Sequence, residues 1–401
     1  MGLSIGLLLG SIGAVVILYL PRAIEYRQPG RTRPPARTAR PGAPSPKPAS
    51  NLAYEENHLH ERRIKQIEQE IYRVLRGLQV REESIQFAQV ARRTRADREW
   101  EHTRVDVSLP AGLSAEKAAR DIEKAVSAFS MSRADLAPEP GGRRIQVFVD
   151  DLPTHVLHLR EDVDTGAQTV QTSPPQPQAG GTRPKVVLVI DDFGMSMAQA
   201  RCFLDLDLPL AYSILPFQAH SRDVARLAND KGRLVMLHLP MQPAGFPEVD
   251  PGPGALLVSM DRSTIEQRVR EAVNEVPFIR GVNNHMGSRF TEDRERMGWV
   301  LEVIKAYQLF YLDSWTSSRS KALSEARRLG LPSAKRTTFL DNIQEPDAVR
   351  IQLRKLVARA RRHGWAIGIG HPYPVTCQVL KTEYNELNTK TDLVPLTDVL
   401  R

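Results

Sequence analysis

Apolar and polar positions divide the chain into regions with different patterns. Residues 3–20 are apolar or small and carry no charge, whereas residues 21–50 are rich in Pro, Arg, Ala and Gly. Residues 51–160 mix helical and alternating patterns, and residues 185–401 repeat short continuous apolar runs. A Pro-, Gly- and Gln-rich stretch at residues 161–184 predicts a linker between the last two regions.

The region 185–401 predicts a parallel α/β domain. Its continuous apolar runs are typical of strands that are buried on both faces. A helical pattern separates each run from the next, and strand and helix alternate about seven times. This rhythm predicts a parallel sheet, either open or closed into a barrel. The predicted strands cover residues 185–190, 210–215, 234–237, 278–282, 309–312, 334–340 and 366–369.

The region 51–160 predicts a small α+β domain. Apolar residues recur at intervals of three and four from Ile64 to Leu78, which predicts a helix, and Ser114 precedes a second helical pattern. Alternation at residues 103–109, 145–149 and 154–159 predicts strands. We find no catalytic constellation here, so its role stays open.

Residues 1–20 predict one N-terminal transmembrane helix. The apolar run is about long enough to cross a bilayer, and no Ala-x-Ala-like cleavage site follows it, which indicates an uncleaved anchor. Arginines cluster between Arg22 and Arg40. The positive-inside rule then favours a cytoplasmic location for the rest of the chain, although long domains translocate largely regardless of charge.

Composition narrows the function classes. The chain has 401 residues, of which 41% are hydrophobic and 25% charged, so it can form at least one sizeable core. The net charge is +8, but no aromatic residues interleave with the arginines at residues 27–40, which disfavours nucleic-acid binding. The two cysteines, Cys202 and Cys377, imply no disulfide framework and lack zinc-ligand spacing.

Chemically active side chains follow five of the predicted strands. In a parallel α/β fold, ligands bind at the carboxyl ends of the strands, which share one rim. Each residue alone has a structural explanation, since Asp192 could cap a helix and His238 could be a satisfied core histidine. Five coincidences at one rim favour a site. The side chains are Asp191 and Asp192, then His238, then Asn284, His285 and Arg289, then Asp313 and Trp315, and finally His371.

A divalent metal is the cofactor that this set predicts. One carboxylate and two imidazoles, from Asp192, His238 and His285, suit Zn²⁺, which we expect, and also Fe²⁺, Co²⁺ or Ni²⁺. Three protein ligands leave a position open for water, as in catalytic sites. Asp191 is then the candidate base and His371 the candidate acid. Candidate residues for orienting a substrate are Asn284, Arg289, Asp313 and Trp315.

Several short motifs resemble those of the divergent branch of the polysaccharide deacetylases. They lie between about residues 185 and 396, and run Val189-Ile-Asp-Asp-Phe-Gly194, His238-Leu-Pro-Met241, Asp250-Pro-Gly-Pro-Gly254, Asn283-Asn-His-Met-Gly-Ser288 and Gly370-His-Pro372. The resemblance implies a distorted seven-stranded (β/α) barrel that hydrolyses the N-acetyl group of an amino sugar with a metal. By position it implies that Asp191 is the catalytic base, Asp192 a metal ligand and His371 the catalytic acid.

The motifs depart from the better-known deacetylases at one ligand. Those enzymes place two metal histidines four residues apart, whereas the fourth residue after His238 is Gln242, so His285 has to supply the missing imidazole. Three functions therefore stay open. The first is an N-deacetylase acting on a cell-envelope polysaccharide. The second is a catalytically silent protein on the same barrel, which binds carbohydrate or acts as an envelope scaffold. The third is another metal-dependent hydrolase.

The resemblance also bears on location and partners. An acetylated envelope polymer is largely absent from the cytoplasm. We therefore expect a membrane-anchored protein whose barrel lies outside the cytoplasm, against the indication of the arginines. The expected ligand is a polysaccharide or amino-sugar oligomer, and residues 51–160 are the candidate contact for an envelope protein partner.

Overall fold

The computed structural model describes residues 57–95, 98–161 and 183–401. The predicted anchor at residues 1–20, the Pro- and Arg-rich stretch at residues 21–50 and nearly all of the linker at residues 161–184 lie outside these ranges. Within them, no helix combines the length and the apolar character needed to cross a bilayer. The described residues from Asn57 to the C-terminus belong to one compact unit.

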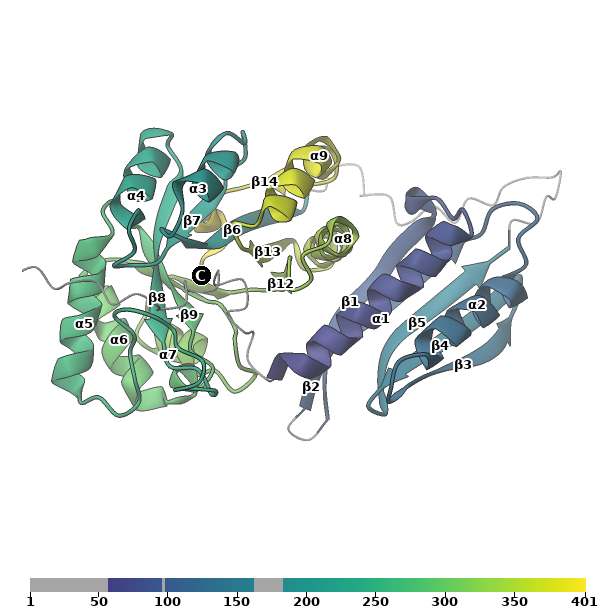
Figure 1. Cartoon of the computed structure of the whole chain (residues 1–401), viewed down its shortest axis with the longest axis horizontal. Coiled ribbons are helices and arrows are strands. Elements are labelled where there is room, and N and C mark those ends of the chain that lie inside the picture. Colours follow the sequence, from purple (N-terminus) through teal and green to yellow (C-terminus); the bar gives the residue numbers. More distant parts are fainter. Residues whose placement is uncertain (1–56, 96–97, 162–182) are drawn as a thin grey trace, which may run out of the picture. The chain divides into compact units, whose positions relative to one another are not determined.

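The first part of the described chain is an α+β arrangement built on a five-stranded sheet (Figure 1). The strand order is β1-β2-β5-β4-β3, and all neighbours are antiparallel except β2 and β5. The elements are α1 (Asn57–Gly77), β1 (Ile85–Arg95), β2 (Arg98–Ser108), α2 (Ala115–Ser127), β3 (Ser132–Glu139), β4 (Gly142–Val149) and β5 (Leu152–Arg160), with a 3-10 turn at Glu82–Ser84.

Helices α1 and α2 pack their apolar stripes on the same core as the sheet. Ile67 and Leu75 of α1 and Ile122 of α2 are fully buried there beside Val107 and Ile145. The structure contains the two predicted helices and three predicted strands. It adds β1 and β3, which the sequence pattern did not indicate. Most side chains in the second half of β1 are exposed, so the sequence there does not need to alternate between apolar and polar residues.

The second part of the described chain is a curled, wholly parallel sheet surrounded by helices (Figure 1). Its strand order is β11-β10-β9-β8-β7-β6-β13-β12, and β14 pairs with β6. The strands are β6 (Lys185–Phe193), β7 (Ala211–Ile214), β8 (Leu234–Met241), β9 (Gly281–Met286), β10 (Phe310–Asp313), β11 (Ser333–Lys335), β12 (Thr338–Phe339), β13 (Trp365–Gly370) and β14 (Asp392–Leu393).

The predicted strand at residues 334–340 is split into two short strands. β11 pairs with β10, and β12 pairs with β13, so the two pieces form opposite ends of the strand order. Only Arg336 and Thr337 separate them. The backbone amide of Arg336 donates to Asp313 O, and that of Thr337 donates to Ile367 O. The sheet is therefore a curled, parallel half-barrel. Its two edge strands, β11 and β12, are consecutive pieces of one broken strand, so it differs from the regular seven-stranded barrel that was expected.

A helix follows most strands and covers the outer face of the sheet. The helices are α3 (Met197–Leu204), α4 (Ser221–Asp230), α5 (Arg262–Glu275), α6 (Arg294–Ala306), α7 (Ala322–Arg328), α8 (Pro346–His363) and α9 (Pro374–Lys390), with 3-10 turns at Phe290–Glu292 and Leu396–Val399. All except α9 match helical patterns in the sequence. One apolar core lies between the helices and the sheet. A second core lines the inside of the curl and includes Val187, Met236, Ile367 and Leu396.

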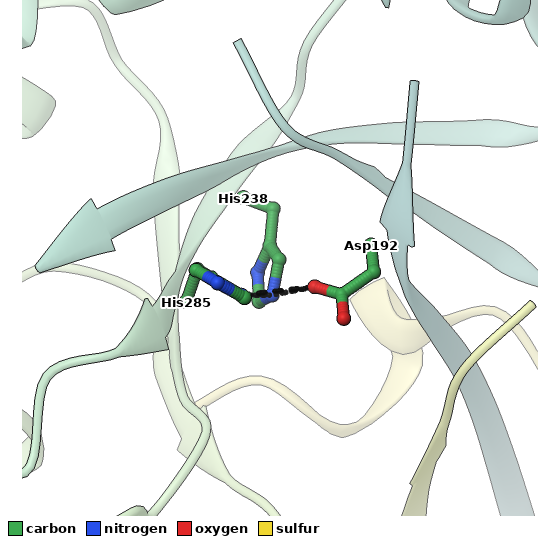
Figure 2. Close-up of side chains that lie close together, drawn as sticks. All are labelled: Asp192, His238 and His285. Carbon is green, nitrogen blue, oxygen red and sulfur yellow. Dashed lines mark hydrogen bonds and ion pairs between the residues drawn. The ribbon is translucent and has the colours of Figure 1, made fainter. Parts of the chain in front are cut away.

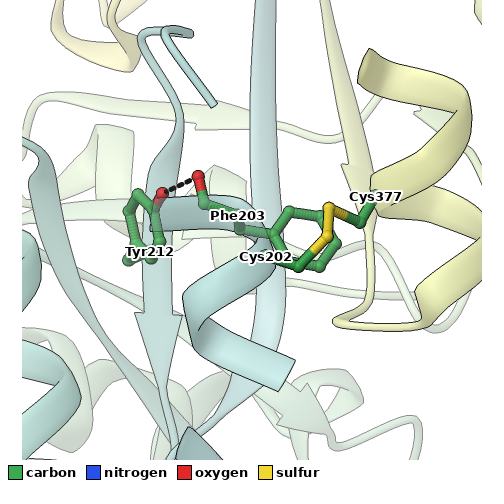
Figure 3. Close-up of a disulfide and its surroundings, with 4 residues drawn as sticks. All are labelled: Cys202, Phe203, Tyr212 and Cys377. Carbon is green, nitrogen blue, oxygen red and sulfur yellow. Dashed lines mark hydrogen bonds between the residues drawn. A yellow bond between two sulfur atoms is a disulfide. The ribbon is translucent and has the colours of Figure 1, made fainter. Parts of the chain in front are cut away.

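Cys202 and Cys377 form a disulfide, contrary to the interpretation of the cysteines from sequence (Figure 3). The bond joins α3 to α9, and its two ends are 175 residues apart in the sequence. Beside it, the hydroxyl of Tyr212 donates to Phe203 O at 2.8 Å. Because α3 follows the turn after Asp192 and α9 follows His371, the bond braces the two ends of the site described next.

Candidate metal centre

Strand alternation directs a set of polar side chains into the curl. Successive strand residues point to opposite faces. Val187 and Val189 line the inner core, so Asp191 on the same strand also points inward. Met236 places His238 inward by the same rule, and Ile369 precedes His371 at the end of β13. The apolar lining therefore ends in polar groups at the carboxyl rim.

Asp192 joins its neighbour Asp191 at this rim because the strand is irregular there. Asp192 has φ of +59°, and the pairing of β6 with β7 shifts between Ile190 and Phe193. A left-handed residue and a bulge interrupt the alternation that would otherwise send adjacent side chains to opposite faces. Both carboxylates can therefore face the imidazoles of β8 and β9.

Asp192, His238 and His285 meet at one point (Figure 2). The Asp192 Oδ1 atom lies 2.9 Å from His285 Nδ1 and 3.2 Å from His238 Nε2. The two imidazole nitrogens are 3.2 Å apart. The rings meet edge to face, with centroids separated by 4.9 Å. The structure thus brings together the three residues that the sequence nominated as ligands.

The electrostatics of this cluster favour a charged carboxylate. Burial alone would raise the pKa of Asp192, but the facing imidazoles of His285 and His238 hold it well below its usual value. Burial lowers the pKa of His238, but the carboxylates of Asp191 and Asp192 outweigh it and raise that pKa. The carboxylate of Asp192 therefore stays negatively charged beside the imidazoles, and a bound cation would stabilise the same charge.

The geometry fits a tetrahedral divalent ion. Ligands about 2.0–2.1 Å from a zinc ion stand about 3.3 Å from one another, close to the three observed separations. Asp192 Oδ1 is buried and has no hydrogen bond of acceptable geometry, despite its close imidazole neighbours. His238 Nδ1 lies 3.0 Å from Asn283 Oδ1, so a proton on Nδ1 leaves the Nε2 lone pair directed at the cluster.

Asn283 connects the ligands to Asp191. Its amide nitrogen donates to Asp191 Oδ1 at 2.8 Å and to Ser314 Oγ at 3.0 Å, while its oxygen also accepts from Ser213. Asp191 itself is 3% exposed, and its Oδ2 lies 3.6 Å from His238 Nε2. The sequence reasoning selected Asn284 and missed Asn283. The alternation that places His285 inward also places Asn283 inward, and could have found it.

His371 approaches the cluster from β13. Its Nε2 lies 3.9 Å from Asp192 Oδ2, and its Nδ1 lies 2.9 Å from Asp341 Oδ1. Burial lowers the pKa of His371, but the carboxylate of Asp341 outweighs it and raises the pKa to about 9. Asp341 is buried and also accepts from Thr376 Oγ1. Asp341 was not predicted, although it follows the predicted strand at residues 334–340 and so lies at a strand end.

The remaining nominated residues lie around the cluster without joining it. Asn284 accepts from the hydroxyl of Tyr311 and donates to Met286 O, so it braces the strand ends. Asp313 is fully buried, which raises its pKa, and it accepts from the amide of Trp315. Arg289 is exposed at the rim.

Trp315 makes cation–π contacts with two basic side chains. Lys335 Nζ lies 3.4 Å from the ring centroid, and the guanidinium of Arg92 in β1 lies 5.5 Å from it. Trp315 has a left-handed backbone conformation, with φ of +54°.

Gln242, the departure from the deacetylase pattern, accepts from the amide of Val258 at 2.8 Å and stands outside the ligand cluster.

The comparisons with known proteins agree with this architecture. The sequence model of the divergent polysaccharide deacetylase family matches residues 188–400, more than half of the chain. The chain therefore belongs to the divergent polysaccharide deacetylases, as the motifs indicated.

Two relatives and one solved structure each match more than half of the chain. The chain is 35% identical to the uncharacterized protein YibQ of Escherichia coli (strain K12) over 216 residues, which are 54% of this chain and 67% of that protein. It is 33% identical to an uncharacterized protein of Haemophilus influenzae over 217 residues, 54% of this chain and 77% of the other. The crystal structure of the uncharacterized protein ATU2773 from Agrobacterium tumefaciens C58 aligns with a TM-score of 0.52 at 22% identity, covering 56% of this chain and 92% of that one. That likeness shows a shared fold.

Proposed function

We propose that this protein is a metal-dependent hydrolase that removes acetyl groups from the amino sugars of a cell-envelope polysaccharide. The observation that carries the proposal is the convergence of Asp192, His238 and His285, with Asp191 close to His238 and His371 close to Asp192. A divalent ion, with zinc as the expected metal, would polarise the acetyl carbonyl and acidify water there.

The protein side chains have separate roles in this scheme. Asp191 accepts the proton of the attacking water, and the amide of Asn283 fixes the carboxylate in position for that transfer. His371 donates a proton through Nε2 to the departing amine, since its Nδ1 is held by Asp341. The two groups reach the ligand cluster from the ends of two paired strands, β6 and β13, so base and acid can both act at the same scissile amide.

We also propose that the catalytic domain works outside the cytoplasm, tethered by residues 1–20. The disulfide between Cys202 and Cys377 supports this location, because disulfides persist in oxidising compartments and are rare in the cytosol. The envelope substrate points the same way. The arginines between Arg22 and Arg40 favour the opposite topology. A phosphatase fusion after Ser50 tests the location: enzymatic activity of the fused phosphatase supports export, and its absence alongside a cytoplasmically active reporter contradicts it.

A second candidate function is a silent barrel that binds glycan without hydrolysing it. The observation in its favour is Gln242, which stands where better-known deacetylases have a second ligand histidine and whose side chain accepts from the amide of Val258. In that case the protein still binds an amino-sugar oligomer, but it need not hold stoichiometric metal.

Metal analysis combined with acetate release separates the two functions. The full-length protein is loaded with Zn²⁺, and acetate release is measured from N-acetylglucosamine oligomers and from peptidoglycan. We expect about one metal per chain, and release that stops on chelation and returns with metal. Asp191→Asn should keep the metal and lose about 10²–10⁴-fold in turnover, the usual contribution of a general base. Bound saccharide without metal or acetate release would favour the silent barrel.

A further inference from the structure

An exposed aromatic ring lies at the same rim as the ligand cluster. Phe217 follows β7, and its side chain is 39% exposed. In the strand order β7 lies between β6, which carries Asp192, and β8, which carries His238. Met195, which follows β6, is 38% exposed. The rim beside the ligands therefore presents apolar surface to solvent, as ligand grooves do.

The backbone around Phe217 is tied to the strand that carries the aspartates. The amide of Leu215 donates to Phe193 O at 2.8 Å, and that of His220 donates to Gly194 O at 2.9 Å. Ser221 Oγ donates to Leu215 O at 2.6 Å. These bonds fix the turn after β7 relative to the end of β6, so the backbone that carries Phe217 is held beside the strand that carries the aspartates.

The motif Asp250-Pro-Gly-Pro-Gly254 packs against the ring of Phe217 through Gly254. Gly254 has φ of +79°, and a Cβ atom at this position would lie 2.5 Å from Cε2 of Phe217. The Asp250 side chain accepts from the amide of Gly252, and Leu256 pairs its backbone with the end of β8. The loop therefore lays a bare backbone against the ring, and only glycine leaves that space open. The motif, which contributes no residue to the ligand cluster, therefore has the role of making room for the Phe217 ring.

We infer that Phe217 is a sugar-contacting residue, whose exposed ring is a platform for one pyranose of the glycan. The apolar C–H face of a pyranose packs on an aromatic ring. A sugar held there, beside the ends of β6 and β8, can direct its acetamido group towards the ligand cluster. The inference rests on the proposed function, because it takes the ligand cluster as the place where the acetyl group binds.

Phe278 provides a matched control. It is also an exposed phenylalanine, at 51%, and it also has a left-handed backbone, with φ of +65° against +60° for Phe217. It precedes β9, however, and so lies at the amino end of the strands, away from the rim. Both residues are therefore exposed phenylalanines with a similar backbone conformation, and they lie at opposite ends of the strands.

The test is the affinity of the full-length, Zn²⁺-loaded protein for the tetramer of N-acetylglucosamine, measured by calorimetry, with acetate release followed in the same samples. We expect Phe217→Ala to weaken binding by about three- to tenfold, the range of one aromatic contact. Phe217→Trp should restore it. Gly254→Ala should weaken binding by displacing the ring, and Phe278→Ala should leave it unchanged. Metal content should be equal in all variants.

The outcomes separate the inference from the proposed function. Equal affinity of the wild type and Phe217→Ala overturns the inference, whatever the acetate assay shows. Binding that depends on Phe217 without any acetate release supports the inference and rejects the hydrolase. If the wild type binds no tetramer, the glycan platform is rejected together with the substrate class of the proposed function.

Discussion

Two buried polar clusters in this protein differ in how their charges are paired. One is the rim cluster at the carboxyl ends of the strands. The other, which we call the α8 cluster, lies where α8 meets α1 and β2. The rim cluster consists of Asp191, Asp192, His238, Asn283 and His285, and the α8 cluster consists of Glu68, Glu101, Gln352, Lys355 and Arg359.

The α8 cluster is balanced within itself. Lys355 is fully buried and binds Glu68 Oε1 at 2.7 Å and also Glu101. Arg359 binds Glu101 as well, and Gln352 donates to Glu68 Oε2. Burial would raise the pKa of Glu101, but Arg359 and Lys355 outweigh it and lower that pKa. Two carboxylates meet two cations, so the cluster needs no ligand to offset its desolvation.

The rim cluster points three lone pairs at one location. Asp192 Oδ1 is left without a hydrogen bond, and two imidazole nitrogens face it and each other. Buried polar atoms normally find partners inside the protein, so the convergence of an unpaired carboxylate oxygen with two imidazole nitrogens favours an ion at this location. The comparison teaches that burial and charge alone do not identify a site. The criterion is whether donors and acceptors balance among the residues themselves.

The largest expected effect comes from removing one ligand of the rim cluster. His285→Asn should abolish stoichiometric Zn²⁺ binding and lower acetate release by about 10³-fold or more, since a metal supplies several kcal/mol of transition-state stabilisation. The metal-free variant should lose less stability than a variant of the α8 cluster, because His238 still faces the Asp192 carboxylate after His285 is replaced. His363→Asn, at an exposed histidine of α8, is the control. Full metal occupancy in His285→Asn would remove His285 from the ligand set.

The opposite result is expected in the α8 cluster. Lys355→Met leaves Glu68 and Glu101 buried without their main partner, so the free energy of unfolding should fall by about 3–5 kcal/mol. Metal content per folded chain should stay constant. Chemical denaturation measures the loss, and Arg361→Met, at an exposed position of the same helix, is the control. A loss below about 1 kcal/mol would show that the carboxylates are solvated after all.

The disulfide should have a smaller effect, because it braces the rim cluster only from outside. Replacing both Cys202 and Cys377 with Ala should lower the free energy of unfolding by about 2–4 kcal/mol, since the bond closes a long loop in the unfolded chain. A thiol reductant should lower the melting temperature of the wild type and leave the variant unchanged. Equal sensitivity to reductant in both proteins contradicts this, and so does a wild type with two titratable thiols.

The rim cluster was largely predictable from sequence, for a physical reason. Strands that are buried on both faces have continuous apolar sequences, so the first polar residue after each apolar run indicates the end of a strand. This identified Asp191, Asp192, His238, His285 and His371. The sequence reasoning nominated Asn284 and not Asn283, although alternation has a period of two and therefore places Asn283 on the same face as His285. Asp341 was missed because the strand before it is broken at Arg336 and Thr337.

The α8 cluster and the disulfide could not be predicted from sequence. Lys355 and Glu68 are 287 residues apart, and each is one charge among many on an amphipathic helix. Nothing local separates a charge that will be buried against another element from a solvated one. The same holds for Cys202 and Cys377, whose pairing depends on α9, a helix absent from the predicted pattern. Contacts distant in sequence are set by packing, which hydrophobic periodicity does not encode.

The smallest expected effect is a pH dependence at the edge of the α8 cluster. Lys65 Nζ lies 5.5 Å from the centre of the Phe339 ring and 3.4 Å from Phe339 O. Burial lowers the pKa of Lys65 to about 8, against the raising effect of Glu61 and Glu101, while Lys355 and Arg336 lower it further. The usual value, 10.5, applies to the unfolded chain.

Between pH 8 and 10.5 the unfolded chain therefore keeps a proton that the folded chain has lost. The free energy of unfolding contributed by Lys65 should therefore rise with pH across this window, and it should be constant below pH 8, where Lys65 is protonated in both states. Relative to Lys65→Met, the wild type should gain about 1 kcal/mol between pH 7 and pH 9. Urea denaturation at both pH values measures the difference, and Lys117→Met, at an exposed lysine of α2, should show no such gain. A constant difference between the wild type and Lys65→Met would mean that Lys65 keeps its proton in the fold, and that the α8 cluster tolerates a third buried cation.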